Sequence, residues 1–168
     1  MFKQSGDTIL LVEDEDAAIL LVQQAVASCP GELHLAVVPN SVAALDWLTI
    51  ETEQGHPVPR LILIDLKLPK LIGLAVLRTL RMDERLQNVP IVVYSEIHEP
   101  SDVVLSYQVG ANSFVKKPDS LPEFSQLLHE LIGLGWLSES GIGKSDSHLA
   151  EIRSSLYTLG VDSKVQQH

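Results

Sequence analysis

The stretch that decides the fold is Leu61-Ile-Leu-Ile-Asp-Leu-Lys-Leu-Pro69, which runs on to Gly73. Its first four residues are consecutive apolar side chains. They are too few for a helix and predict a strand buried on both faces of a parallel sheet. Asp65 stands at the carboxyl end of this strand, the edge at which ligands bind in an open α/β sheet. Because Asp before a Pro is also a common turn residue, only the rest of the chain can decide its role.

Strand and helix patterns alternate along the whole chain. Short apolar runs predict strands at residues 8–14, 33–38, 61–65, 90–95 and 113–116. Apolar residues at helical spacing predict helices at residues 17–28, 41–52, 73 to about 81, 100–107 and from 121 toward 136. We expect Asp16 and Ser41 to cap the first two helices and Gly73 to open the third. Such alternation with short connections predicts a five-stranded parallel sheet, doubly wound with helices on both faces.

Composition and charge narrow the functional class. The chain has 168 residues and a net charge of -10, which argues against nucleic-acid binding and against an anionic membrane surface. The same charge suits a divalent cation or a basic protein partner. A single cysteine, Cys29, excludes an internal disulfide, and no Cys/His cluster has the spacing of a zinc site. We therefore expect a cytoplasmic protein, and no apolar run is long enough to span a membrane.

The expected strand ends bring five candidate site residues to one edge of the sheet. They are Glu13 and Asp14 from the first strand, Asp65 from the third, Ser95 from the fourth and Lys117 just after the fifth. Two carboxylates 4 Å apart repel each other by roughly 4 kcal/mol at an effective dielectric constant of about 20, so a cation is the natural remedy. Mg²⁺ prefers oxygen ligands and takes one or two carboxylates. We expect Asp14 and Asp65 to bind it directly and Glu13 to act through water.

This set of residues fits phosphoryl transfer. A carboxylate such as Asp65 can attack a phosphoryl group and form an acyl phosphate. The transition state spreads negative charge over the equatorial oxygens, which Lys117 and a metal can neutralise. The hydroxyl of Ser95 can then donate a hydrogen bond to one phosphoryl oxygen and hold a loop in place. The pattern thus indicates a reaction that changes the surface of the protein.

From about Thr8 to Trp136 the chain resembles a response-regulator receiver domain of two-component signalling. The resemblance implies a flavodoxin-like sheet with strand order 2-1-3-4-5 and Mg²⁺ or Mn²⁺ as the cofactor. It assigns Asp65 as the phospho-acceptor, Glu13 and Asp14 as the acidic pair, and Lys117 as the lysine of the family's Lys-Pro pair with Pro118. It also assigns Ser95 and Phe114 as switch residues and the backbone carbonyl of Lys67 as a further metal ligand.

The resemblance also implies a function. We expect residues 1–137 to form a stand-alone receiver that accepts a phosphoryl group from a sensor histidine kinase and assists only its own phosphorylation and dephosphorylation. The surface of the fourth helix, fifth strand and fifth helix should then change and mediate homodimer formation or partner docking. Loops at 68–73 and 83–90 and the Gly-Trp-Leu segment ending at Leu137 resemble the single-domain regulators paired with bacterial and cyanobacterial phytochromes.

Two loop positions depart from the usual pattern, and the tail is separate. Lys67 stands where this subfamily commonly has Asn, and Ile72 stands where Asp often precedes the Gly. Residues 138–168 read as a flexible linker and a short tail, with a helical pattern from about 147 to 159. The apolar seam of that tail is Leu149, Ile152, Leu156 and Leu159. One interpretation is that this segment lies on its own domain or stays disordered, because an isolated helix of this length is marginal. The other is that it pairs with the same segment of a second chain or with a partner.

Three other functions compete with this interpretation. A phosphatase-like hydrolase with an aspartyl nucleophile would need a second acid at position 67, where Lys stands. A flavodoxin-like carrier would need a phosphate-binding loop after the first strand, where Glu13-Asp-Glu-Asp16 would repel phosphate. A phosphorylation-independent adaptor would not need the complete set of Asp14, Asp65, Ser95 and Lys117.

Overall fold

The computed structural model describes residues 7–66, 70–96 and 99–133 of the chain. Five parallel strands form one sheet in the order β2-β1-β3-β4-β5, which confirms the predicted doubly wound arrangement. The strands are β1 (Thr8–Val12), β2 (His34–Val38), β3 (Leu61–Asp65), β4 (Ile91–Ser95) and β5 (Ser113–Lys116). The helices are α1 (Asp16–Ser28), α2 (Ser41–Glu53), α3 (Lys70–Met82), α4 (Pro100–Val109) and α5 (Leu121–Gly133), with a 3₁₀ turn η1 (Glu84–Leu86).

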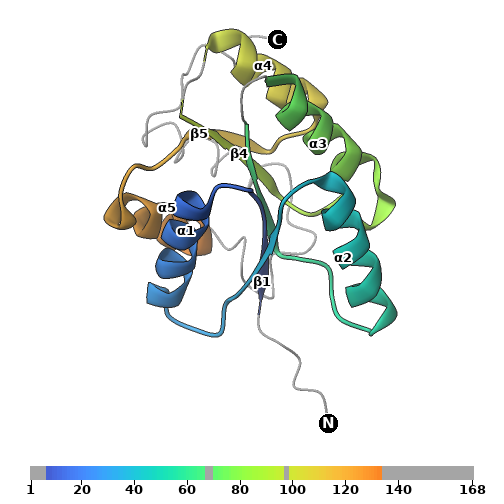
Figure 1. Cartoon of the computed structure of the whole chain (residues 1–168), viewed down its shortest axis with the longest axis horizontal. Helices are drawn as coiled ribbons and strands as arrows, with labels where there is room; N and C mark the ends of the chain where they lie inside the picture. Colours follow the sequence, from blue (N-terminus) through green and yellow to red (C-terminus); the bar gives the residue numbers. More distant parts are fainter. Residues whose placement is uncertain (1–6, 67–69, 97–98, 134–168) are drawn as a thin grey trace.

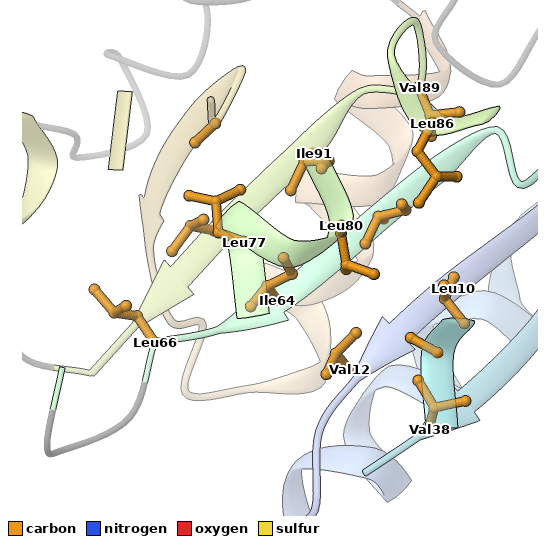
Figure 2. Packing of buried hydrophobic residues seen from close by; sticks show 14 of the residues in the cluster. Leu10, Val12, Val38, Ile64, Leu66, Leu77, Leu80, Leu86, Val89 and Ile91 are labelled. Atoms are coloured by element: carbon orange, nitrogen blue, oxygen red, sulfur yellow. The ribbon is translucent and has the colours of Figure 1, made fainter. Parts of the chain in front are cut away.

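The helices cover the sheet from two sides. In Figure 1, α1 and α5 lie side by side on one face, and α2, α3 and α4 lie on the other. Each face has its own apolar core, and every residue of the central strand β3 is buried between them. Figure 2 shows the core on the α2, α3 and α4 side, where Ile64 and Leu66 lie near Leu77 of α3. A strand buried on both faces explains why β3 reads as a continuous apolar run.

The strand register places all carboxyl ends at one edge. Asp65, the last residue of β3, pairs with Tyr94 of β4, and Ser95 pairs with Lys116 of β5. β1 ends at Val12, so that Glu13 follows its strand directly. The parallel pairing therefore delivers the ends of β1, β3, β4 and β5 to the same region without any further adjustment.

Helix starts differ from the sequence prediction at three places. α1 begins at Asp16 with Glu15 at the N-cap position, so Asp16 lies inside the first turn. Asn40, and not Ser41, caps α2, because the Asn40 side chain accepts a hydrogen bond from the backbone N–H of Ala43 at 2.9 Å. α3 begins at Lys70, before Gly73, so the prediction that Gly73 opens the helix was wrong.

Gly73 has a packing role instead. A Cβ atom at this position would lie 2.6 Å from Cδ1 and 3.0 Å from Cα of Leu66. Leu66 is the residue that directly follows Asp65, so α3 packs against the end of β3 at this glycine. The absent side chain permits the close approach of helix and strand, which a residue with a Cβ atom would prevent.

Arg81 ties the far end of α3 to the neighbouring loops. Its guanidinium group donates hydrogen bonds to the backbone carbonyls of Gly110, Leu86, Gln87 and Val89 and to the side chain of Asn112. Gly110 ends α4 as predicted, with a φ of 130° that a residue without a Cβ atom adopts readily. A single, partly buried cation thus joins the ends of α3, η1 and α4 to the start of β4.

No helix within residues 7–66, 70–96 and 99–133 combines the length and apolar character needed to span a membrane. Within these ranges, α5 is described to Gly133. The predicted tail, residues 138–168, lies outside the described residues, as does Trp136.

Candidate functional site

Four of the predicted site residues lie together at the carboxyl edge of the sheet. All four are almost completely buried, with exposed fractions of 2% for Glu13, 9% for Asp65, 4% for Ser95 and 7% for Lys117. Nζ of Lys117 lies 3.5 Å from Oδ2 of Asp65 and 3.7 Å from Oε2 of Glu13. The backbone N–H of Lys117 donates to the carbonyl of Ser95 at 2.8 Å, which ties the end of β4 to the end of β5. The parallel sheet thus concentrates two acids, one hydroxyl and one ammonium.

The remaining predicted residues occupy different surroundings. Asp14 is exposed beside the buried Glu13, so it is the acid of the pair that faces solvent. Phe114 is 1% exposed and belongs to the core on the α2, α3 and α4 side of the sheet. Lys116 is exposed whereas Lys117 is buried, which fixes the register at the end of β5. Lys67 lies outside the described residues, so its backbone carbonyl stays a predicted metal ligand.

Glu13 is held by hydrogen bonds to both of its carboxylate oxygens. Oε1 accepts from the backbone N–H groups of Asp14 at 3.2 Å and Glu15 at 3.0 Å. Oε2 accepts from the hydroxyl of Tyr94 at 2.8 Å. These donors orient the carboxylate toward the interior of the site, beside Lys117 and Asp65.

Asp65 is shifted toward its neutral form. Its pKa is raised from 3.8 to about 7, first by burial and then by the nearby Glu13 carboxylate, while the ammonium of Lys117 opposes both effects. Burial likewise raises the pKa of Tyr94, with Glu13 as the next cause, so the phenol keeps its proton and remains a hydrogen-bond donor. A raised pKa at a buried carboxyl group is typical of functional sites.

Lys117 is shared among four carboxylates. Besides Asp65 and Glu13, Glu15 lies 3.9 Å from its Nζ atom and Glu96 lies 4.0 Å from it. Both of these acids are largely exposed, with 54% and 69% of their side chains accessible. Sequence reasoning missed Glu96 as a neighbour of the site, and the signal for it was its place directly after Ser95 at the end of β4.

The charge of this site fits a divalent cation. More carboxylates surround Lys117 than one ammonium can neutralise, and the raised pKa of Asp65 reflects this excess. Among the described residues, no three His, Cys, Asp or Glu side chains are grouped closely enough to hold a metal by themselves. Mg²⁺ needs only one or two carboxylates, with water and phosphate oxygens as its other ligands. Asp65 and the exposed Asp14 supply oxygen donors of this kind.

Ser95 and Tyr94 are neighbours with different partners. The hydroxyl of Ser95 donates to the backbone carbonyl of Leu66 at 3.2 Å. Tyr94, which sequence reasoning missed, is 1% exposed and points to the α1 and α5 side of the sheet. Its signal in the sequence was an aromatic residue with a polar end in an otherwise aliphatic strand, directly before the hydroxyl residue.

Comparisons with known proteins give one family. Residues 9–129 match the family described as "Response regulator receiver domain". The chain is 33% identical over 135 residues to the probable methanogenesis regulatory protein FilR2 of Methanothrix harundinacea, a match that covers 79% of this chain and 87% of that protein. It is 33% identical over 121 residues to response regulator Rcp1 of Synechocystis sp., covering 71% of this chain and 82% of that protein.

Two solved structures are similar in both sequence and fold. The Mn²⁺-bound form of Rcp1 superimposes with a TM-score of 0.65 at 30% identity, covering 82% of this chain and 99% of that one. The phosphorylated cyanobacterial phytochrome response regulator RcpA gives a TM-score of 0.67 at 32% identity, covering 83% of this chain and 99% of that one.

Proposed function

Because the chain belongs to the family of response regulator receiver domains, we propose that it is a stand-alone regulator that accepts a phosphoryl group from a histidine kinase onto Asp65, with Mg²⁺ or Mn²⁺ as cofactor. Receiver domains are signalling domains that sensor histidine kinases phosphorylate. The observation that carries the proposal is the pairing of the buried Asp65 carboxylate with Lys117 at the carboxyl edge of the sheet. An isolated acid at a strand end would have no such partner.

The reaction is an in-line transfer. An Oδ atom of Asp65 attacks the phosphorus of a phosphohistidine, the P–N bond breaks, and its electron pair stays on the imidazole nitrogen. The product is an acyl phosphate on Asp65. Lys117 neutralises negative charge on the transferred group from its position 3.5 Å from the acceptor carboxylate. The divalent cation, when bound, neutralises further phosphoryl charge, and Asp14, Asp65 and the backbone carbonyl of Lys67 would hold it, with Glu13 in support.

The signal is a change of hydrogen bonding at Ser95. Its hydroxyl donates to the carbonyl of Leu66 in the unphosphorylated chain. A phosphoryl oxygen on Asp65 is a stronger, charged acceptor and draws this donor toward the site. Ser95 ends β4, and its carbonyl accepts a hydrogen bond from the backbone N–H of Lys117 after β5. A movement of Ser95 therefore displaces the neighbouring α4, β5 and α5, and Phe114 repacks in the core. That surface then docks a partner or a second copy of the chain.

The similarity to the phytochrome response regulator RcpA supports a phytochrome-type kinase as the phosphodonor. We place the site of action in the cytoplasm. We assign the receiver to residues 1–137 and treat residues 138–168 as a linker and tail. Transfer from an autophosphorylated phytochrome kinase, compared with a kinase of another sensor class, tests the choice of donor. A sedimentation experiment with and without phosphodonor tests the homodimer.

The central test is a phosphorylation assay on the purified chain. Incubation with acetyl phosphate and Mg²⁺ should add the mass of one phosphoryl group, and Asp65→Asn should abolish this gain. Asp46→Asn, which changes an exposed carboxylate on α2, is the matched control and should be phosphorylated like the wild type. A wild-type chain that gains no mass, or an Asp65→Asn chain that still does, would contradict the proposal.

A further inference from the structure

Tyr94 lies inside the site, but the proposed phosphoryl transfer assigns it no role. In the sheet it pairs with Asp65 of β3 on one side and with Val115 of β5 on the other. It directly precedes Ser95, but its ring lies in the core on the α1 and α5 side, whereas Phe114 lies in the opposite core. The residue is 1% exposed, so its contacts are with the protein.

The hydroxyl of Tyr94 fixes one oxygen of Glu13. It donates to Oε2 at 2.8 Å, while Oε1 is engaged by two backbone N–H groups. The same Oε2 atom lies 3.7 Å from Nζ of Lys117, a separation longer than that of a direct charge-assisted hydrogen bond. The tyrosine hydroxyl thus supplies a hydrogen bond to Oε2, so the ammonium does not have to do so. Nζ of Lys117 faces Asp65 instead, whose Oδ2 atom lies 3.5 Å away, slightly closer than Oε2 of Glu13.

The ring of Tyr94 supports the ammonium directly. Nζ of Lys117 lies 5.3 Å from the ring centroid, within the range of a cation–π interaction. The ring itself meets Phe124 of α5 edge to face, with centroids 6.0 Å apart and an interplanar angle of 84°. The contact with α5 therefore sets the orientation of the Tyr94 ring. The ring in turn positions its hydroxyl at Glu13 and its face beside the ammonium of Lys117.

We propose that Tyr94 is a positioning residue for phosphoryl transfer, which keeps Glu13 from capturing Lys117 and so holds the ammonium at the acceptor Asp65. Without the hydroxyl, Oε2 of Glu13 loses this hydrogen bond, and Lys117 is the nearby cation that can replace it. The ammonium then moves toward Glu13 and away from the incoming phosphoryl group. This inference rests on the proposed function, because it concerns the same reaction.

The test separates the hydroxyl from the ring. Tyr94→Phe keeps the ring and should lower the maximal rate of phosphorylation by acetyl phosphate at saturating Mg²⁺ by about tenfold, the effect of one hydrogen bond to a charged group. The acetyl phosphate concentration that gives the half-maximal rate should change little, since the Tyr94 hydroxyl bonds to Glu13 and is not proposed to contact acetyl phosphate. Tyr94→Leu removes the ring as well and should lower the rate further. Ser113→Ala, which deletes a buried hydroxyl from β5, is the control and should match the wild type.

Two further variants test whether Tyr94 acts through Glu13 and through the orientation of its ring. In a Glu13→Gln background, Tyr94→Phe should add little to the loss, because Tyr94 acts through Glu13. If Tyr94→Phe does not fold, Phe124→Leu, which frees the ring and keeps the hydroxyl, should lower the maximal rate by about threefold. Equal rates for Tyr94→Phe and Ser113→Ala, or full additivity with Glu13→Gln, would overturn the inference. A wild-type chain that is not phosphorylated would instead overturn the proposed function.

Discussion

The ammonium of Lys117 and the carboxylate of Asp65 face each other at 3.5 Å across the carboxyl edge of the sheet, with 8% and 6% of their side chains exposed. Asp65 ends β3 and Lys117 directly follows β5, so the two residues are 52 positions apart in the chain. The distance is longer than that of a tight ion pair, since Lys117 also serves Glu13, Glu15 and Glu96. The acceptor thus stays incompletely neutralised, and this excess charge governs how the site responds to pH and to cations.

The first prediction concerns the stability of the metal-free chain. The pKa of Asp65 is raised to about 7 from an ordinary value of 3.8, so the folded chain binds this proton more tightly than the unfolded chain. The stabilisation from Asp65 is complete below about pH 4, declines between pH 4 and 7, and is lost above pH 7. Asp65→Asn removes this titration. In EDTA, the variant should gain about 3 kcal/mol in free energy of unfolding over the wild type between pH 4.5 and pH 8.

Urea denaturation at both pH values measures this difference. Added Mg²⁺ should stabilise the wild type and have little effect on Asp65→Asn, because a ligand stabilises only the state that binds it. A difference between the two chains that does not change with pH would rule out the raised pKa.

A second prediction compares two adjacent lysines. Lys117→Met leaves the buried Asp65 and Glu13 carboxylates without their ammonium and should lower the free energy of unfolding at pH 8 in EDTA by about 3 kcal/mol. Lys116→Met changes an exposed side chain and should stay within about 0.5 kcal/mol of the wild type. Thermal and urea unfolding measure both effects. Similar losses for the two variants would show that the buried charge pair contributes nothing particular.

The third prediction concerns Arg81, far from the site. Arg81→Met removes the guanidinium donor from the backbone carbonyls of Gly110 and Val89 and should lower the free energy of unfolding by about 3 kcal/mol. Arg85→Met is the matched control: the exposed Arg85 forms a surface ion pair with Asp83, and its loss should cost less than about 1 kcal/mol. Equal costs for the two variants would exclude a joining role for Arg81.

A fourth prediction rests on the sequence at position 67. Lys67 places a positive charge two residues after the acceptor, and its loss should leave the phosphoryl group less neutralised. We expect Lys67→Asn to shorten the half-life of the acyl phosphate by about threefold, with Lys116→Asn as the control. The half-life is measured by removing acetyl phosphate and following the phosphorylated mass over time. An unchanged half-life would remove any role for this lysine in dephosphorylation.

Much of the candidate site could be predicted because strand ends in a parallel sheet share one edge. The apolar runs before Asp65 and Ser95 located two strands without any tertiary information. The helix starts were harder, since Asn40 and Ser41 are both good capping residues and only the backbone path decides between them. Gly73 was misread for a similar reason: a glycine favours a helix end by propensity, but here the contact with Leu66 requires it.

By itself, the sequence determined the sheet, its alternation with helices, and the set of acids, hydroxyl and lysine at the strand ends, because periodicity and residue type act locally. The tertiary structure alone decided which of these groups touch. The bond from Tyr94 to Glu13 joins residues 81 positions apart, and the edge contact with Phe124 depends on how α5 packs against the sheet. No local pattern encodes such contacts, since they arise only when separate strands and helices are brought together by burial of their apolar faces.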